Sequence, residues 1–138
     1  MHFLVVTGSF YTEIAEMLEA GAIAALKKHD IAYTIVQVPG ALEIPAVIAR
    51  GAESGEFDGF VALGCVIRGE TSHYETVCGE SARGLMDLSI HYGLAIGNGI
   101  LTTENMAQAI CRADPEQSNK GGEAAVAALV VASAFQSK

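Results

Sequence analysis

The stretch "ALGCVIRGETSHYETVC", residues 62–78, decides the fold, because it changes from strand to helix within a few residues. Its first part belongs to the continuous apolar run 59–66, which is typical of a strand buried on both faces. Residues 74–93 are predicted to form a helix that ends at a glycine. A buried strand that leads directly into a helix is the repeating unit of a parallel sheet.

The same alternation extends from this stretch toward both ends of the chain. Apolar runs predict further strands, and helical periodicity or capping signals predict further helices. Right-handed crossovers between such units give an α/β fold, a three-layer αβα sandwich with a four-stranded parallel sheet. We expect one domain over residues 1–138. The other predicted strands are 2–6, 33–38 and 94–101, and the other predicted helices are 12–28, 42–54 and a last helix from about residue 120.

Charge and composition narrow the class of partner. The formal net charge of −8 argues against a nucleic-acid groove, although a local site can still bind an anion. Hydrophobic residues make up 51% of the chain and charged residues 17%, an apolar excess that favours a subunit interface. The segment 122–135 is apolar almost all the way round, so we expect a helix wedged between its own sheet and a neighbouring subunit. The longest apolar run, 124–132, is too short for a membrane span.

Cysteine and histidine spacings give no sign of a disulfide or a metal site. The odd number of cysteines, without a CxxC pair, fits reduced thiols in a cytoplasm. The histidines are scattered and form no HxxxH or HExxH pair, so we expect no metal. The residues concerned are Cys65, Cys78, Cys111, His2, His29, His73 and His91.

The strand-to-helix corner carries the first candidate site. Ser72 and Glu75 have the spacing of a capping box, which predicts a helix that starts after Ser72. The backbone amides of residues 69–73 then lie at or before a helix N-terminus, where they can bind an anion such as phosphate. Gly69 allows close approach and Thr71 adds a hydroxyl. An ordinary capped helix start remains the alternative.

His73 and Cys65 lie beside this corner. At the first helical position the dipole disfavours the imidazolium, and a neutral His73 next to an anion can accept a proton. The alternative is a solvated polar residue. Cys65 lacks the G-x-C-x-G pattern of a nucleophile elbow, so we interpret it as a small buried hydrophobe.

With these residues identified, the chain resembles the 6,7-dimethyl-8-ribityllumazine synthase family over nearly its whole length. The resemblance is carried by "GSFYTEI", "VPGALEIP", "ALGCVIRGETSHYETVC", "GNGILTTEN" and "NKGGEAA", in that order and spacing. It implies a transferase of riboflavin biosynthesis. The enzyme condenses 5-amino-6-(D-ribitylamino)uracil with 3,4-dihydroxy-2-butanone 4-phosphate and releases phosphate and water. It implies no cofactor, and a flavodoxin-like subunit in a homopentamer or decamer with active sites shared between neighbours.

The resemblance also implies a role for each matching residue. Phe10 would stack on the pyrimidine, and Val66 and Ile67 would hold its edge through their backbone. His73 would move protons. The ribityl chain would be held around Ala41, Leu42 and Glu43. The phosphate would be held by Gly69, Glu70 and Thr71. A neighbouring subunit would supply Asn98, Arg112 and Lys120, with Arg112 clamping the phosphate. Each of these residues also has an interpretation without a role in binding. Glu43 could be an acid in the first turn of a helix, and Arg112 and Lys120 could be solvated cations at helix ends.

Some positions depart from the family pattern. Asn98 stands where many members have an aromatic, Ser9 stands in place of an arginine, and Leu42 replaces a common aromatic. These changes bear on substrate affinity rather than on reaction type. The loop 113–121 lacks the Gly-Thr-Lys turn of shell-forming members, and no arm precedes the first strand. Both features favour pentamers, or a pair of them, over a capsid.

Three other functions stay open at the level of the sequence. A pentamer of the same fold could bind a flavin or lumazine with weak or no catalysis. A riboflavin synthase of the same fold would release riboflavin from lumazine alone. A shell protein would depend on assembly and not on the site residues.

Overall fold

The computed structural model describes residues 1–136 and contains one parallel sheet of four strands, in the order β2-β1-β3-β4. Residues pair in a continuous register, for example Val5 with Ile35 on one side and with Val61 on the other. The pairing between β3 and β4 extends over eight residues from Phe60. The strands are β1 (His2–Gly8), β2 (Ala32–Val38), β3 (Gly59–Ile67) and β4 (Ile96–Thr103).

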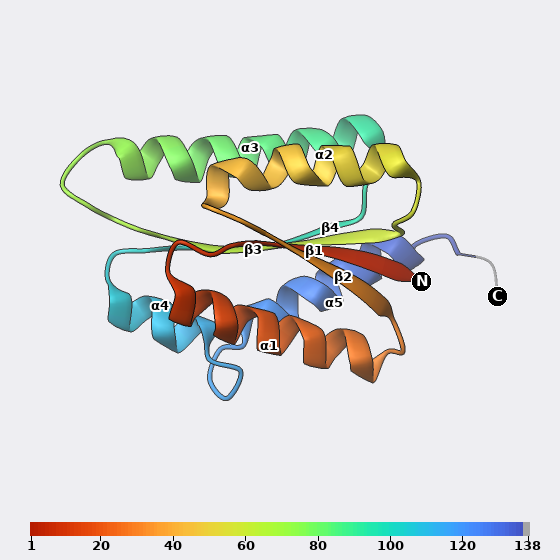
Figure 1. Ribbon diagram of the computed structural model, residues 1–138, viewed down its shortest axis with the longest axis horizontal. Helices are drawn as coiled ribbons and strands as arrows, with labels where there is room; N and C mark the ends of the chain where they lie inside the picture. The colour runs from red at the N-terminus through yellow and green to blue at the C-terminus, as the bar shows by residue number, and fades with distance from the viewer. Residues whose placement is uncertain (137–138) are drawn as a thin grey trace.

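Helices cover both faces of this sheet (Figure 1). On one face lie α1, α4 and α5, and on the other lie a short 3-10 helix η1, α2 and α3. This arrangement confirms the predicted α/β sandwich with a four-stranded parallel sheet. The bounds are α1 (Thr12–Lys28), η1 (Ala41–Glu43), α2 (Ile44–Ser54), α3 (His73–Tyr92), α4 (Met106–Ala113) and α5 (Lys120–Ser133).

Two apolar cores lie on the two faces of the sheet. Successive side chains of β1 and β3 point to opposite faces, so each strand contributes to both cores. Because both faces are covered, these strands are almost completely buried and their sequences are continuously apolar. The core toward α1 and α5 includes Phe3, Leu18, Leu63 and Ala125. The core toward α2 and α3 includes Val6, Ile44, Ile48 and Phe60.

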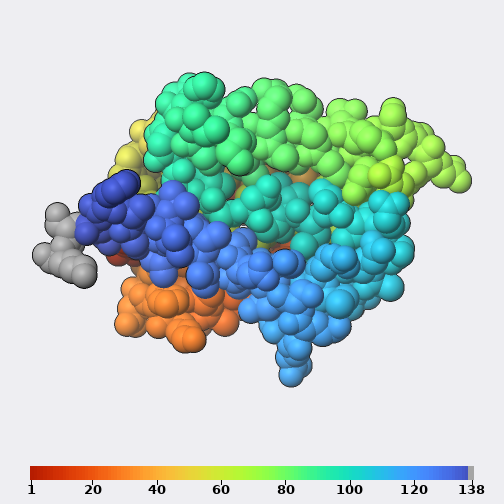
Figure 2. All heavy atoms as spheres, turned by 180° about the vertical axis from the view of Figure 1, so that it is seen from behind, coloured from red at the N-terminus to blue at the C-terminus, as the bar shows by residue number. Residues whose placement is uncertain are grey.

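Parallel pairing brings the carboxyl ends of all four strands to one edge of the sandwich, where the loops into the following helices gather (Figure 1). β4 is an outer strand, and Figure 2 shows it, in blue-green, reaching the surface between α3 above it and α4 and α5 below it. The carbonyls of Ala95, just before β4, and Thr103, its last residue, accept hydrogen bonds from the amides of Phe60 and Arg68 on the β3 side. Since hydrogen-bonding direction alternates along a strand, the even-numbered residues of β4 present their amides and carbonyls to the open side.

The outward face of α5 is apolar and exposed, as the sequence predicts. Val126, Val130 and Val131 expose 42%, 64% and 52% of their surface, while the inward face of α5 packs on α1 and β4. Within residues 1–136 no helix combines the length and hydropathy needed to cross a bilayer. A large apolar face of this kind on a chain with a net charge of −8 is typical of a protein–protein contact.

Close contact between β4 and α5 depends on a glycine. A Cβ at Gly97 would overlap the carbonyl oxygen of Ala124 on α5. We expect Gly97→Ala to lower the free energy of unfolding by about 2–4 kcal/mol, because backbone on both sides would have to move. Urea unfolding at one fixed protein concentration measures the change.

The matched control is Gly79→Ala on α3, where an added Cβ would meet nothing within 4 Å. This change should leave stability level or raise it by up to about 1 kcal/mol, since alanine is the better helix former. Equal unfolding midpoints for the two variants would contradict the close packing of β4 on α5.

Candidate active site

The loop 68–72 joins β3 to α3 at the carboxyl edge of the sheet. His73 is the first residue of α3 and Ser72 its N-cap, as predicted. The loop is exposed, and the amides of Gly69, Glu70 and Thr71 donate to no protein acceptor within residues 1–136. Free amides that precede a helix N-terminus form a site for an anion.

The capping box predicted for this helix start is wrong. The Ser72 side chain makes no capping bond. Instead the His73 amide donates to the Thr71 hydroxyl at 3.3 Å, and the Glu75 carboxylate is engaged by Arg68. Ser72 is therefore the N-cap by its backbone alone, and the Glu75 carboxylate bonds to Arg68 instead of to the Ser72 amide.

Arg68 lies between two carboxylates. Its Nη1 donates to Glu75 Oε1 at 2.5 Å, and its Nε donates to both oxygens of Glu104 at 2.9 and 3.1 Å. The guanidinium also stacks on the Tyr74 ring at 4.3 Å from the centroid. The hydrogen bond from Arg68 holds the pKa of Glu75 below its ordinary value, so the carboxylate stays charged.

A pocket beside this loop, which we call the corner pocket, collects most of the residues predicted to bind the pyrimidine. Its volume of about 400 Å³ lies in the range of small-molecule sites. It is formed where the segments after β1 and β2 meet the carboxyl end of β3, with the start of α3 as a fourth wall. The lining residues are Phe10, Tyr11, Gly40, Ala41, Leu42, Glu43, Cys65, Val66, Ile67, His73 and Val77.

Two residues of the corner pocket show how it can hold a substrate. Phe10 is 74% exposed, and its ring meets Tyr11 edge to face with the centroids 4.9 Å apart, so one face of Phe10 is open to an aromatic partner. Glu43 accepts the Gly40 amide at 2.9 Å through Oε1. This bond fixes the carboxylate at the pocket wall and leaves Oε2 for hydroxyl groups.

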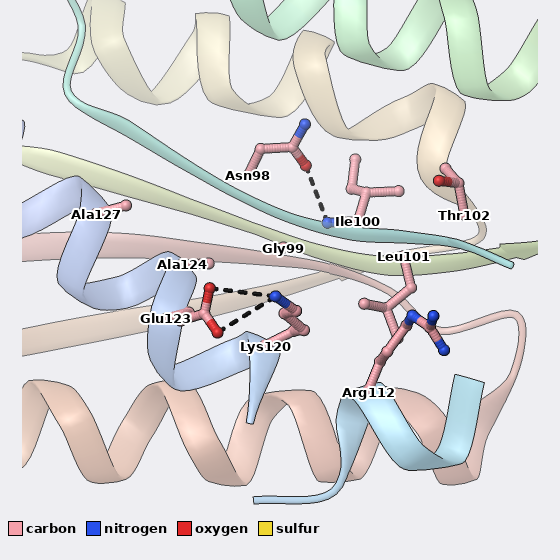
Figure 3. A pocket seen from close by; sticks show the side chains of 10 residues that line it. All are labelled: Asn98, Gly99, Ile100, Leu101, Thr102, Arg112, Lys120, Glu123, Ala124 and Ala127. Carbon is pink, nitrogen blue, oxygen red and sulfur yellow. Dashed lines mark hydrogen bonds and ion pairs between the residues drawn. The ribbon is translucent and has the colours of Figure 1, made fainter. Parts of the chain in front are cut away.

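A second pocket, which we call the edge pocket, lies along β4 (Figure 3). The side chains of Arg112 from α4 and Lys120 from α5 both border it. Lys120 bonds to both oxygens of Glu123 at 3.3 Å, and Arg112 donates to the Gln108 carbonyl at 3.2 Å. The lining residues are Asn98, Gly99, Ile100, Leu101, Thr102, Arg112, Lys120, Glu123, Ala124 and Ala127.

Asn98 lies on the open side of β4 in the edge pocket. Its Oδ1 accepts the Ile100 amide at 2.9 Å, a bond within the same strand (Figure 3). The side chain therefore covers one of the amides that the outer strand leaves unpaired. The NH2 group of the Asn98 side chain remains exposed as a hydrogen-bond donor at the pocket wall.

The predicted site residues thus fall into two groups on one chain. Phe10, His73 and their neighbours line the corner pocket, while Asn98, Arg112 and Lys120 line the edge pocket, and the two share no residue. The anion loop 69–71 adjoins the corner pocket through His73. Arg112, which the resemblance assigns to the phosphate, and Lys120, which it places close to the substrates, both lie in the edge pocket and not beside that loop.

Sequence reasoning missed part of both pockets. Tyr11 and Val77 line the corner pocket, and Glu123 lines the edge pocket beside Lys120. Tyr11 was detectable as the neighbour of Phe10 in the loop after a parallel strand. Glu123 was detectable as an acid three residues after Lys120 on one helix face. Glu104, which binds Arg68, gave no signal because its partner lies 36 positions away.

Cys65 is less buried than predicted. It lies near the end of β3, is half-buried and lines the corner pocket. Burial raises the pKa of the Cys65 thiol to about 11, and a hydrogen bond with Thr103 lowers it by less. A thiol that stays protonated near neutral pH is a poor nucleophile, in line with the interpretation as an inert side chain.

The arrangement supports acid–base chemistry beside a bound anion. One exposed aromatic face, one histidine and a row of free amides meet in or beside the corner pocket. Among residues 1–136 no cluster of three or more His, Cys, Asp or Glu side chains has a geometry that could hold a metal ion.

Comparisons with known proteins agree on one family. The family model described as 6,7-dimethyl-8-ribityllumazine synthase matches residues 1–136. A protein of that name from Erythrobacter litoralis is 58% identical over 129 residues, covering 94% of this chain and 91% of the relative. One from Novosphingobium aromaticivorans is also 58% identical, with 94% and 92% covered. A third, from Bartonella henselae, is 55% identical, with 94% and 84% covered.

The pKa of Cys65 predicts how this thiol reacts with iodoacetamide. At pH 9 the thiolate fraction in the folded protein should be about fiftyfold below that of the urea-unfolded chain, whose thiol titrates near 9.0. Mass spectrometry of the Cys65 peptide gives both labelling rates.

The slope against pH separates ionisation from simple shielding. In the folded protein the Cys65 rate should keep rising about tenfold per pH unit from 8 to 10, whereas in the unfolded chain it should level off above 9. A folded-state rate that levels off in the same way would show that the thiol is shielded but its pKa is not raised.

Proposed function

The chain belongs to the 6,7-dimethyl-8-ribityllumazine synthase family, and from this premise we propose how its residues divide the work of the reaction. The protein condenses 5-amino-6-(D-ribitylamino)uracil with 3,4-dihydroxy-2-butanone 4-phosphate to 6,7-dimethyl-8-ribityllumazine. Phosphate and water are released, and the step is the penultimate one of riboflavin biosynthesis. We take the whole chain, 1–138, as one domain. The unpaired thiols of Cys65, Cys78 and Cys111 support the cytoplasm as its compartment.

The observation that carries the proposal is the separation of the two pockets. The corner pocket has the free amides and a histidine next to it, and the edge pocket has Arg112 and Lys120. A head-to-tail contact that brings the edge pocket of one subunit to the corner pocket of the next would unite them. Such heterologous contacts close into a ring when the rotation from one subunit to the next divides a full turn. The family resemblance supports a homopentamer or decamer with active sites between subunits.

In each shared site the pyrimidine lies in the corner pocket. Phe10 offers its open face for stacking, which suits a flat heteroaromatic ring. Backbone groups of Val66 and Ile67, near the end of β3, bind the polar edge of the pyrimidine. The ribityl hydroxyls bind the backbone of Ala41 and Leu42 and the free oxygen of Glu43.

The phosphate of the second substrate lies at the loop 69–71. The amides of Gly69, Glu70 and Thr71 point to no protein acceptor within residues 1–136, which supports this role. The partner subunit's Arg112 supplies the balancing charge, and the partner subunit's Lys120 lies close by. A guanidinium suits this task because it binds phosphate oxygens in pairs.

The reaction then follows from positioning and proton transfer. The pyrimidine amine attacks the ketone, and the carbinolamine loses water to give an imine. Loss of a proton from the adjacent carbon lets phosphate leave, and the amides and the partner subunit's Arg112 stabilise the leaving charge. The enol tautomerises, and the second nitrogen closes the ring with loss of water.

His73 takes up and returns protons in these steps. It lines the corner pocket and directly follows the anion loop, so it lies between the pyrimidine and the phosphate. Holding two substrates together in one site supplies much of the rate, because the condensation is intrinsically feasible. His73 therefore contributes to the rate without being indispensable.

Replacing His73 tests this division. In His73→Ala we expect kcat to fall about ten- to a hundredfold and to stay above the protein-free blank, since general acid–base catalysis is one contribution among several. Lumazine absorbance measures the rate. His91→Ala, at the exposed end of the same helix α3, is the matched control and should keep the full rate. A folded His73→Ala protein with no activity above the blank would contradict the proposal.

Mixing defective subunits tests the shared site. One variant carries Phe10→Ala and His73→Ala in the corner pocket, and the other carries Arg112→Ala and Lys120→Ala in the edge pocket. In an equal mixture assembled together, about a quarter of the sites should combine two intact halves. The mixture should then exceed the sum of the separate variants in lumazine formation.

The control is the same pair of variants assembled apart and mixed afterwards, which should show no gain. A co-assembled mixture no more active than the sum of its parts would place each site within one chain and would remove the ring proposal.

A further inference from the structure

We propose that Arg68 is a positioning residue that holds the anion loop in shape through Glu75 and Glu104, and that it does not bind the phosphate itself. The inference rests on the proposed function, because it takes the loop 69–71 as the phosphate site. Arg68 precedes Gly69 directly, so its place in the sequence would suggest a phosphate-binding cation. The contacts of its side chain point to the other role.

The guanidinium joins three elements at the start of the loop. Arg68 follows β3, Glu75 lies in the first turn of α3, and Glu104 follows β4. The distances are 2.5 Å to Glu75 and 2.9 and 3.1 Å to Glu104. The Tyr74 ring supports the guanidinium from one face. We call the Arg68, Glu75 and Glu104 side chains the clasp.

The loop itself has few other supports. Between Arg68 and His73 the only side-chain bond in the described part of the chain is that of the Thr71 hydroxyl with the His73 amide. An added Cβ at Gly69 would meet nothing within 4 Å, so the loop packs against no neighbour there. At its first residue the Arg68 amide donates to the Thr103 carbonyl at 2.9 Å. The clasp therefore acts where the loop is otherwise held by one backbone bond.

Charge also argues against direct binding of phosphate. One guanidinium with two carboxylates leaves the clasp with a net negative charge, which repels a phosphate. Two of the three guanidinium nitrogens, Nε and Nη1, already donate to carboxylates. The clasp is exposed, with 42% of the Arg68 side chain accessible. Exposed ion pairs add little to global stability, so its effect should be local to the loop.

The decisive variant is Glu75→Gln with Glu104→Gln. It releases Arg68, removes two negative charges and keeps the side-chain shapes. If the clasp positions the loop, KM for the butanone phosphate should rise about tenfold, because misplaced amides bind the phosphate less well. KM for the pyrimidine should stay within about twofold of its value in the unchanged protein. The thermal unfolding midpoint should stay within about two degrees, because exposed ion pairs add little to stability. The dissociation constant of inorganic phosphate, measured by calorimetry, should rise by the same factor as KM.

Direct binding by Arg68 predicts the opposite sign. Freeing the guanidinium and removing two carboxylates would then tighten phosphate binding and lower KM. A fall in KM, or no change, would overturn the proposal. Arg68→Met should raise KM as the double variant does, and adding it to the double variant should have no further effect, since both break the same clasp.

A matched control lies on the same helix. Arg83 bonds to Glu80 at 2.8 Å and to Asp87 at 2.9 Å on the surface of α3, so it repeats the charge pattern of the clasp away from the loop. Glu80→Gln with Asp87→Asn should change neither KM. If it raised KM for the phosphate substrate as much as the test variant does, the effect would be one of overall charge.

Phosphate binding by the unchanged protein separates this inference from the proposed function. An unchanged protein that binds no inorganic phosphate and forms no lumazine would remove both. An unchanged protein that does both, together with a double variant that behaves like it, would overturn the role of Arg68 alone.

Discussion

The parallel hydrogen bonding of β3 to β1 on one side and to β4 on the other fixes where the functional residues lie. It brings the ends of these strands to one edge of the sheet, where Ile67 pairs with Thr103 and lines the same pocket as Phe10, although the three lie far apart in the chain. The corner pocket forms between the loops at this edge. The same pairing leaves the other side of β4 open, and the edge pocket forms there. Both candidate half-sites thus result from one sheet.

Local charge, rather than net charge, decides how this acidic protein can bind a phosphate. The chain carries a net charge of −8, yet the amides of residues 69–71 and the guanidinium of Arg112 present donors to an anion. Arg68 is the cation nearest to that loop in the sequence, and it is neutralised by Glu75 and Glu104. A free cation for the anion therefore has to come from another part of the surface.

Different parts of the fold hold the side chains of the two pockets in place. Part of the corner pocket lining belongs to β3, η1 and the start of α3, whose regular backbone holds the polar groups there in place. Around the edge pocket, Gly97 allows α5 to approach β4 closely, and this approach sets where Lys120 lies. Packing of α5 on β4 thus determines where Lys120, which we propose to lie close to the substrates, is held.

Most of the strands and helices, and part of the candidate site, could be predicted from the sequence. Continuous apolar runs predicted the four parallel strands, and β1 and β3 are buried on both faces as such runs indicate. The outer strand β2 is largely exposed, which the sequence did not indicate. The start of α3 at His73 and the free amides before it were also predicted, although the capping box that indicated this start does not form. The short helix α4 was not assigned, since eight residues give too little periodicity.

The sequence alone did not predict which charged residues form ion pairs across the fold. Glu75 appeared to cap Ser72, three residues away, but the folded chain brings Arg68 to it, and Glu104 to Arg68 from 36 positions further along. The sequence also could not predict that the site residues divide between two pockets, because this division depends on which strand lies at the edge of the sheet. The sequence by itself determined the elements and the chemistry at their ends, through local patterns of burial and hydrogen bonding. Only the tertiary structure decided which charged groups meet, because strand order and helix packing bring together residues that no local pattern relates.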